Sequence, residues 1–364
     1  MRIATRLSAF LLLALTALAF GAPAASEYRL AAPAAPTNVQ ATQGSYTNKI
    51  RITWNSASGA NSYRVYRSMS YNGPWTVYIA TPSGTTYDDY FSNAGYKYYY
   101  RISSCTYSSG ASCGAMSYPP ATGWVKPEAP SYISATDGAY TSKVRISWGA
   151  VDDATAYKLY RGTDTDGYNS GPITIGGATY WDELNIVPGR TYYWWVRAYN
   201  SATNSTSSFK GPNSGYRQLA APTGFVATDG IYCDKTKLVW NYAEGATSYT
   251  ITRGDSPSSH NQTWSVGQTT QEFYDYSGNA SQVYYYWVKA CSTDTGCGPS
   301  TLYNDGFRGV PPRPRRHHGH RWRICQPREH PLGRTHGRHL LSALPRHQPQ
   351  FHRHAGGLYP GYQL

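Results

Sequence analysis

The stretch Val144-Arg145-Ile146-Ser147-Trp148 alternates apolar and polar side chains and ends on a tryptophan. It follows the turn sequence Ala135-Thr136-Asp137-Gly138, and the same order of turn, alternating strand and tryptophan occurs three times in the 364 residues. The other two strands end at Trp54 and Trp240, which lie 94 residues before and 92 residues after Trp148. An internal repeat of about 90–100 residues therefore decides the fold.

Further landmarks keep the same spacing through the three copies. The strand after the tryptophan opens on a tyrosine and closes on an arginine, and a later aromatic strand is preceded by an aspartate. Alternation at period two, with short strands and frequent turns, is typical of a two-sheet β-sandwich. The landmarks are Tyr63, Tyr157 and Tyr249; Arg67, Arg161 and Arg253; Asp88, Asp182 and Asp275; and Tyr98, Tyr192 and Tyr284.

The copies resemble fibronectin type III domains in their Pro-containing entry segments, their second-strand Trp and the strand Tyr63-Arg64-Val65-Tyr66-Arg67. The segment from Pro188 to Tyr192 adds to the resemblance. The resemblance implies an all-β chain of three tandem immunoglobulin-like (fibronectin type III) β-sandwiches in a row. It also implies that Trp54, Trp148 and Trp240 fill the cores, and that Tyr98, Tyr192 and Tyr284 are corner tyrosines. The expected repeats are residues 32–126, 127–218 and 219–309.

The ends of the chain differ from the repeats. Residues 1–25 combine Arg2 and Arg6, a short apolar run and a small-residue cleavage pattern at Ala22-Pro23-Ala24, which predicts a secretory signal peptide. We therefore expect a secreted, extracellular or cell-surface protein with no membrane span in the mature chain. Most of the net charge of +13 lies after residue 307, where there are eleven Arg, one Glu and no Lys or Asp. The repeats are thus nearly neutral, which argues against a nucleic-acid partner.

Residues 310–364 predict an Arg/His/Pro-rich disordered tail, because no periodic apolar face is present. One alternative is a metal site at His317, His318, His320 and Cys325, and another is a polyanion site at Arg315, Arg316, Arg321 and Arg323. A third hypothesis is a fourth repeat in a shifted reading frame, since an offset of one base permits a tryptophan codon at position 332, 92 residues after Trp240. The nucleotide sequence decides this; absence of that codon in the offset frame contradicts the idea.

The cysteines suggest local disulfides. Cys105 and Cys291 occupy the same repeat position, and each is followed shortly by a second cysteine, Cys113 or Cys297. In an exported protein these predict the disulfides Cys105–Cys113 and Cys291–Cys297, next to the sixth strand. Cys233 and Cys325 have no assigned partner. No Cys-x-x-Cys knuckle is present, so neither a metal nor another cofactor is expected.

The repeats contain no nucleophile elbow, zinc-protease motif or phosphate loop, and His260 is their only histidine. We expect no enzyme. Asp88, Asp182 and Asp275 could be catalytic, but one isolated acid per module favours a turn-capping role. Strand alternation instead turns several aromatic side chains outward, as a flat surface for sugar rings or a protein partner. Ordinary cross-strand aromatic pairing is the alternative. The residues of this predicted surface are Tyr66, Tyr99, Tyr160, Tyr193, Trp195, Tyr285 and Trp287.

The expected function is a non-catalytic extracellular module array that acts as a spacer, an adhesion segment or a polysaccharide-contact segment. In exported bacterial proteins such arrays accompany polysaccharide-degrading domains, as the resemblance implies. The alternative is an accessory fragment of a secreted polysaccharide-degrading hydrolase whose catalytic domain lies elsewhere. The expected partner is a polysaccharide or another extracellular protein.

Overall fold

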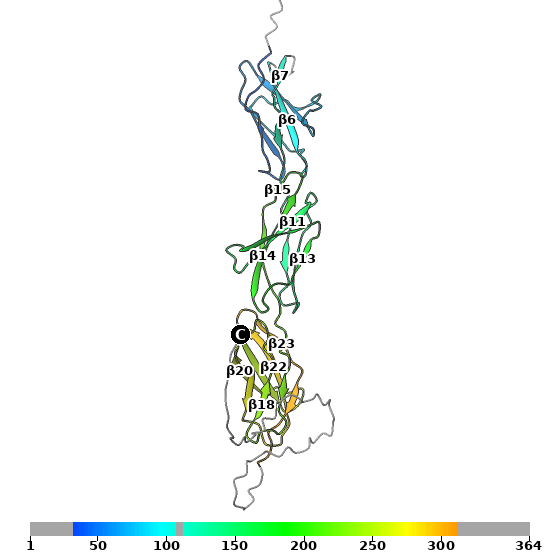
Figure 1. The fold of residues 1–364 in the computed structure, drawn as a ribbon. Helices are drawn as coiled ribbons and strands as arrows, with labels where there is room; N and C mark the ends of the chain where they lie inside the picture. Colours follow the sequence, from blue (N-terminus) through cyan, green and yellow to red (C-terminus); the bar gives the residue numbers. More distant parts are fainter. Residues whose placement is uncertain (1–31, 107–111, 312–364) are drawn as a thin grey trace, which may run out of the picture. The chain divides into compact units, whose positions relative to one another are not determined.

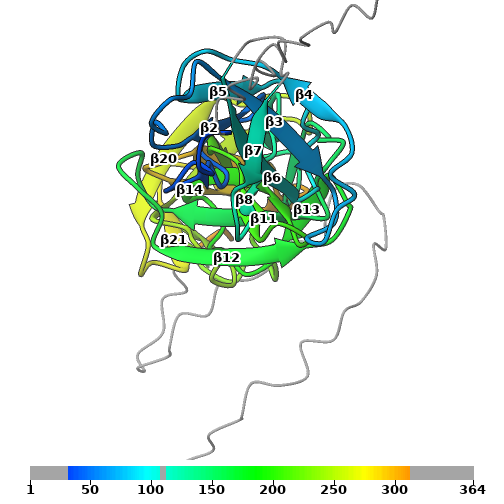
Figure 2. The same cartoon turned by 90° about the horizontal axis from the view of Figure 1, so that it is seen from above.

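The computed structural model describes residues 32–106 and 112–311. Every regular element in these two ranges is a β-strand (Figures 1 and 2). The strands form three pairs of sheets, and each pair combines a three-stranded sheet with a five-stranded one. The predicted all-β fold of three sandwiches is confirmed. The predicted signal peptide and nearly all of the predicted tail lie outside the described residues.

The first module occupies residues 40–123. Its three-stranded sheet has the order β1-β2-β5, and its five-stranded sheet has the order β4-β3-β6, with β7 and β8 both paired to β6. The strands are β1 (Gln40–Ala41), β2 (Ile50–Thr53), β3 (Ser62–Ser68), β4 (Tyr78–Ala80), β5 (Thr86–Asp89), β6 (Tyr98–Cys105), β7 (Cys113–Met116) and β8 (Ala121–Gly123).

The second module repeats this arrangement over residues 133–216. The order is β13-β10-β9 in one sheet and β12-β11-β14 in the other, with β15 and β16 both paired to β14. The strands are β9 (Ile133–Ala135), β10 (Val144–Trp148), β11 (Ala156–Gly162), β12 (Ser170–Ile175), β13 (Tyr180–Glu183), β14 (Thr191–Asn200), β15 (Ser205–Thr206) and β16 (Lys210–Tyr216).

The third module occupies residues 226–306 with the same pattern. Its sheets have the orders β17-β18-β21 and β20-β19-β22, with β23 and β24 both next to β22. The strands are β17 (Val226–Ala227), β18 (Thr236–Val239), β19 (Ser248–Gly254), β20 (Gln262–Gly267), β21 (Glu272–Asp275), β22 (Tyr284–Ser292), β23 (Gly296–Ser300) and β24 (Asn304–Gly306).

The alternating residues of the strands build the cores. Along β10, Val144, Ile146 and Trp148 are buried, whereas the residues between them are partly exposed. Trp54, Trp148 and Trp240 are 5%, 1% and 4% exposed, so the prediction that they fill the cores is confirmed. Burial of such large apolar side chains is the main favourable contribution to folding, about 1.5–3 kcal/mol for each one.

Two tyrosines in each module tie loops to the sandwich. The hydroxyls of Tyr98, Tyr192 and Tyr284 each accept a hydrogen bond from a backbone N–H five residues upstream, at 3.1, 3.3 and 3.0 Å. The predicted corner tyrosines are thereby confirmed in all three copies, although Pro188-Gly189 precedes the tyrosine in the second copy alone. The hydroxyls of Tyr63, Tyr157 and Tyr249 act in the same way six residues upstream, at 3.1, 2.8 and 3.0 Å.

One edge of each five-stranded sheet is interrupted. The last strand of the module consists of two short pieces, and a single aromatic residue lies in each interruption: Tyr118, Phe209 or Tyr303. In the second module the piece β16 contains Gly211 at a φ of 122°, where a Cβ atom would lie 2.5 Å from the carbonyl oxygen of Trp194. Glycine is needed there both for the backbone conformation and for the close approach of the two strands.

Candidate functional site

The recurring acids fall into two sets, not into the single set expected from the sequence. The register pairs Ile50 with Asp89, Val144 with Glu183 and Thr236 with Asp275. Asp275 is therefore equivalent to Asp89 and Glu183, whereas Asp88 and Asp182 lie one residue earlier. The expectation of one recurring acid at Asp88, Asp182 and Asp275 is wrong, because a shift of one residue moves a strand side chain to the other face.

Asp88 and Asp182 form ion pairs on the outside of the three-stranded sheets. Asp88 lies 2.7 Å from Nε of Arg51 and 2.8 Å from Nζ of Lys49. Asp182 repeats both distances with Arg145 and Lys143. The hydrogen bonds from these arginines hold the pKa values of both carboxyls well below their usual range. Both acids therefore stay charged and paired, which suits a structural role; neither caps a turn.

The second set is buried and joins three elements of the sandwich. Asp89 has no exposed surface; its carboxylate accepts hydrogen bonds from Nη1 of Arg67 at 2.9 Å and from the Tyr100 hydroxyl at 2.8 Å. Burial, and then the neighbouring Asp89 carboxylate, raise the pKa of Tyr100 far above its usual range. The Asp89–Arg67–Tyr100 group is thus a closed structural network with every carboxylate oxygen occupied.

The third module contains the same group at Asp275, Arg253 and Tyr286. Asp275 accepts hydrogen bonds from Arg253 at 2.6 Å and from Tyr286 at 2.9 Å. Burial opposes ionisation of Asp275, but hydrogen bonds from Ser277, Arg253 and Tyr286 outweigh it and lower the pKa of this carboxyl. Because the Ser277 N–H donates to Asp275 at 2.8 Å, the predicted turn-capping role holds for this acid.

The second module departs from the other two. Glu183 replaces the aspartate, Trp194 replaces the tyrosine, and Arg161 lies 3.8 Å from the Glu183 carboxylate. A cavity of about 290 Å³ opens beside these three side chains. The longer acid still accepts the Asn185 N–H at 3.0 Å, so the turn is held although the closed network is absent.

The aromatic surface predicted from strand alternation is largely covered. Tyr160 and Trp195 lie directly across from each other in the register of β11 and β14, yet they are only 4% and 8% exposed. Tyr66 and Trp287 are buried as well. Tyr99, Tyr193 and Tyr285 are half-buried. The prediction of an exposed Tyr160–Tyr193–Trp195 patch is therefore wrong, because alternation identifies the outer face of a sheet but not what lies over it.

In the second module the covering rings are Tyr168 and Phe209. Tyr168 comes from the β11–β12 connection, and its ring centroid lies 4.4 Å from that of Tyr160 and 6.2 Å from that of Trp195. Phe209 comes from the break between β15 and β16 and lies 5.4 Å from Tyr168. Both remain substantially exposed, at 46% and 37%. Arg197 lies against Phe209 and donates a hydrogen bond to the Tyr160 hydroxyl, which fixes the base of this cluster.

The other modules place rings from the same two segments over their outer faces. In the first module Tyr71, from the β3–β4 connection, lies 5.7 Å from Tyr99 on β6. The ring of Tyr118, from the break between β7 and β8, lies 5.0 Å from the guanidinium of Arg101 on the same strand. In the third module His260 lies 4.4 Å from Trp287, and Tyr303 lies 6.1 Å from the same ring. Sequence reasoning missed all of these covering residues, because connections have no periodicity from which to assign a face.

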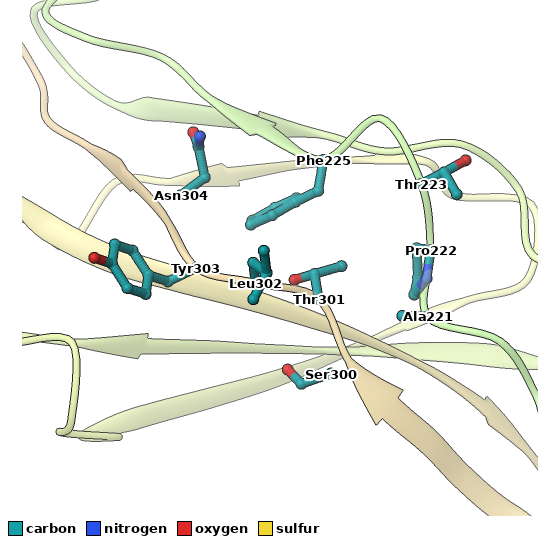
Figure 3. A pocket seen from close by; sticks show the side chains of 9 residues that line it. All are labelled: Ala221, Pro222, Thr223, Phe225, Ser300, Thr301, Leu302, Tyr303 and Asn304. Carbon is teal, nitrogen blue, oxygen red and sulfur yellow. The ribbon is translucent and has the colours of Figure 1, made fainter. Parts of the chain in front are cut away.

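The third module also has a groove on its surface, and Tyr303 is one of the residues that line it. It has a volume of about 450 Å³ and lies between the entry segment Ala221–Phe225 and the segment Ser300–Asn304. Figure 3 shows Phe225, Thr301 and Leu302 close together on these facing segments. The groove is lined mostly by apolar and hydroxyl side chains, and no acid or base lines it.

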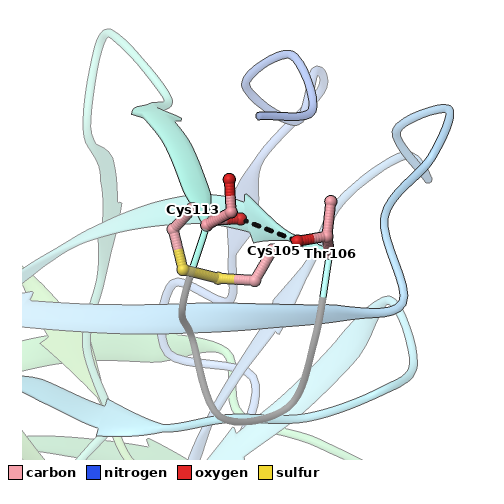
Figure 4. The surroundings of a disulfide bond; sticks show 4 residues. Cys105, Thr106 and Cys113 are labelled. Atoms are coloured by element: carbon pink, nitrogen blue, oxygen red, sulfur yellow. Dashed lines mark hydrogen bonds between the residues drawn. A yellow bond between two sulfur atoms is a disulfide. The ribbon is translucent and has the colours of Figure 1, made fainter. Parts of the chain in front are cut away.

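The structure contains a disulfide between Cys105 on β6 and Cys113 on β7, with a Cα–Cα distance of 4.0 Å (Figure 4). The Thr106 N–H donates to the Ser112 carbonyl at 3.1 Å and closes the same hairpin. Cys291 on β22 and Cys297 on β23 are also in disulfides. Cys233, for which the sequence offered no partner, is disulfide-bonded too. Cys325 lies outside the described residues.

Within residues 32–106 and 112–311, no three His, Cys, Asp or Glu side chains gather as a metal site would require. The same residues include no helix with the length and apolar character needed to cross a membrane. The predicted alternatives for the tail, including the His317–Cys325 metal site, fall on residues that the structure does not describe.

Comparison with curated proteins finds two amylopullulanases. That of Thermoanaerobacterium saccharolyticum is 35% identical over 100 residues, which are 26% of this chain and 8% of the relative. That of Thermoanaerobacterium thermosulfurigenes is 36% identical over 100 residues, which are 26% of this chain and 5% of the relative. The match therefore spans less than a tenth of the length of either amylopullulanase. No family model matches the chain.

Among solved structures, the chain is similar to the FN1–FN3 domains of chicken CNTN1, with 16% identity and a TM-score of 0.24 over 75% of this chain and 98% of that one. It is also similar to a segment of two fibronectin type III domains from chicken tenascin, with 18% identity and a TM-score of 0.38 over 50% and 97% of the chains. Both neighbours are fibronectin type III structures. With its repeated pairs of three- and five-stranded sheets, the chain is an all-β protein of repeated β-sandwiches.

Proposed function

We propose that the chain is a non-catalytic extracellular module array that contacts polysaccharide. The observation that carries the proposal is that the acids of the sandwiches are paired within the modules, whereas aromatic rings remain exposed. The buried acids are occupied by arginine and tyrosine or by a turn N–H, and the outer acids Asp88 and Asp182 are occupied by Lys and Arg. Each module also leaves several aromatic rings exposed, and such rings suit contact with sugars.

Two findings support an exported location and an association with polysaccharides. Disulfide bonds at Cys105–Cys113 and in the third module suit an oxidising, exported environment. The matched segments belong to amylopullulanases, so modules of this type accompany a polysaccharide-processing activity in those proteins. The same matches fit the second candidate, an accessory fragment of a secreted polysaccharide-degrading hydrolase, which assigns the same contact role to the modules.

A pull-down on insoluble polysaccharide tests the proposal. The purified chain is incubated with starch granules, cellulose or chitin, and both bound protein and released reducing sugar are measured. Retention without release of reducing sugar is the expected result. Release of reducing sugar contradicts the non-catalytic assignment. Absence of retention on all three polymers contradicts the contact role and leaves the modules as spacers.

A further inference from the structure

We infer that each module carries a sugar-stacking platform on the outer face of its five-stranded sheet, and that each platform binds a neutral polysaccharide. This inference rests on the proposed function and names its site. We define the platforms by their ring pairs: Tyr71 with Tyr118, Tyr168 with Phe209, and His260 with Tyr303.

The platforms occupy equivalent places in the fold. The first ring of each pair comes from the connection that precedes the outer strand β4, β12 or β20. The second ring comes from the break in the opposite edge strand, between β7 and β8, β15 and β16, or β23 and β24. The two segments are far apart in the sequence of each module, yet both bring their rings over the same central strand: β6, β14 or β22.

Each platform rests on a packed base. Tyr168 lies over Tyr160 and Trp195, which are buried, while Tyr168 itself is 46% exposed. His260 and Tyr303 rest on the buried Trp287, and both are exposed. A ring that packs on buried side chains on one side and is exposed to solvent on the other is already ordered before a ligand binds. Binding to it therefore has a lower entropic cost.

Charge and chemistry select the ligand class. An aromatic ring presents an apolar face, which matches the apolar C–H face of a pyranose ring. Residues 127–218 contain eight Lys or Arg and eight Asp or Glu, and residues 219–309 contain five and eight, so the second and third modules lack the net positive charge that favours a polyanion. The first module differs, since residues 32–126 contain seven Lys or Arg and two Asp. Beside Tyr168, the connection also carries Asp164, Asp166 and Asn169, which can accept or donate hydrogen bonds to sugar hydroxyls. The ligand class that fits is an uncharged sugar polymer.

The threefold repetition identifies a polymeric occupant. A polymer presents the same kind of sugar ring many times, so each of the three equivalent platforms meets the same ligand on it. The residue types differ between modules although the placement is the same, so the shared property is an exposed ring rather than a specific hydrogen bond. This pattern suits a ligand that repeats along its length.

The test compares two matched sets of substitutions in the full chain. The platform variant combines Tyr71→Ala, Tyr168→Ala and His260→Ala, and removes one exposed ring from each module. The control variant combines Tyr90→Ala, Tyr180→Ala and Tyr276→Ala, three exposed tyrosines that lie on or next to β5, β13 and β21 of the other sheet. Circular dichroism and urea titration establish that each variant is folded before its binding is compared.

Retention is measured on starch granules, cellulose and chitin, with polygalacturonate as the charged polymer. The wild type and the control variant are expected to bind a neutral polymer equally, whereas the platform variant loses binding. A single substitution such as Tyr168→Ala should weaken binding by about 2- to 12-fold, the equivalent of one aromatic contact.

A folded platform variant that binds as strongly as the wild type overturns the platforms and leaves the proposed function intact. Equal loss in the control variant, or preference for polygalacturonate, also overturns them. If the wild type itself binds none of the polymers, both the proposed function and the platforms are rejected.

Discussion

The hydroxyl of Tyr286 donates a 2.9 Å hydrogen bond to Asp275, a carboxylate that is 2% exposed. This bond links β22 of the five-stranded sheet to β21 of the three-stranded sheet across the core. The bond therefore holds the two sheets together. Because its acceptor is charged, it is stronger than a hydrogen bond between neutral groups.

Tyr286→Phe is therefore expected to destabilise the third module by about 1.5–3 kcal/mol, because the substitution deletes a hydrogen bond to a charged group without changing the packing of the ring. Urea unfolding combined with hydrogen exchange of peptides from β21 and β22 measures the effect. Tyr285→Phe, on the half-buried outer side of the same strand, is the control and should change stability by less than about 0.5 kcal/mol. Equal effects of the two substitutions would contradict the role of this bond.

Acid is expected to destabilise the protein. The pKa values of Asp88, Asp182 and Asp275 are all lowered in the folded state. A carboxyl with a lowered folded-state pKa stabilises the protein above its unfolded-state pKa of about 3.9, and this stabilisation is lost as the pH falls below that value. Urea midpoints should be constant between about pH 5 and 7 and fall below about pH 4. In Asp182→Asn the decrease on acidification should be smaller than in the wild type.

Alkali is expected to destabilise the protein through two buried tyrosines. Burial raises the pKa values of Tyr100 and Tyr286 far above the usual range. A tyrosine with a raised folded-state pKa stabilises the protein below its unfolded-state pKa of about 10, and the stabilisation is lost above that pH. Thermal melts should therefore shift to lower temperature above about pH 10. In Tyr100→Phe and Tyr286→Phe this shift should be reduced; an unchanged shift in the double variant would refute the assignment.

The Cys105–Cys113 disulfide should stabilise the first module alone. The bridge spans eight residues in sequence, a loop for which the chain-entropy model gives roughly 2–3 kcal/mol. Cys105→Ser combined with Cys113→Ser should increase hydrogen exchange in β6 and β7 and leave β10 and β14 of the second module unchanged. Equal exchange in β6 before and after the substitution would show that the bridge has no such effect.

The sequence was sufficient to predict the core and the corners but not the outer faces. Trp148 and Tyr192 could be placed because the period of two, repeated three times, fixes which side chains point inward. Trp195 was assigned correctly to the outer face, yet its burial depends on Tyr168 and Phe209, which come from irregular segments. Contacts of that kind depend on how the connections fold back, and no local pattern encodes this.

The acids illustrate a second limit. Asp182 and Asp275 were paired because they share a residue type and nearly the same spacing. The register, however, makes Glu183 the counterpart of Asp275, and Trp194 stands in the second module where the third has Tyr286. Such paired changes between two sheets are visible only when the strands are placed next to each other.

The interrupted outer strands affect the tendency of the protein to aggregate by pairing of sheet edges. An edge strand carries unpaired backbone N–H and C=O groups, and three similar sandwiches in one chain present several such edges, which can promote sheet extension between molecules. In the second module Pro172 lies in β12 and Pro212 lies in β16, at the two edges of the five-stranded sheet. Proline lacks the N–H group that an incoming strand would need. In the second module the proline-bearing edges therefore oppose pairing with an incoming strand of another molecule.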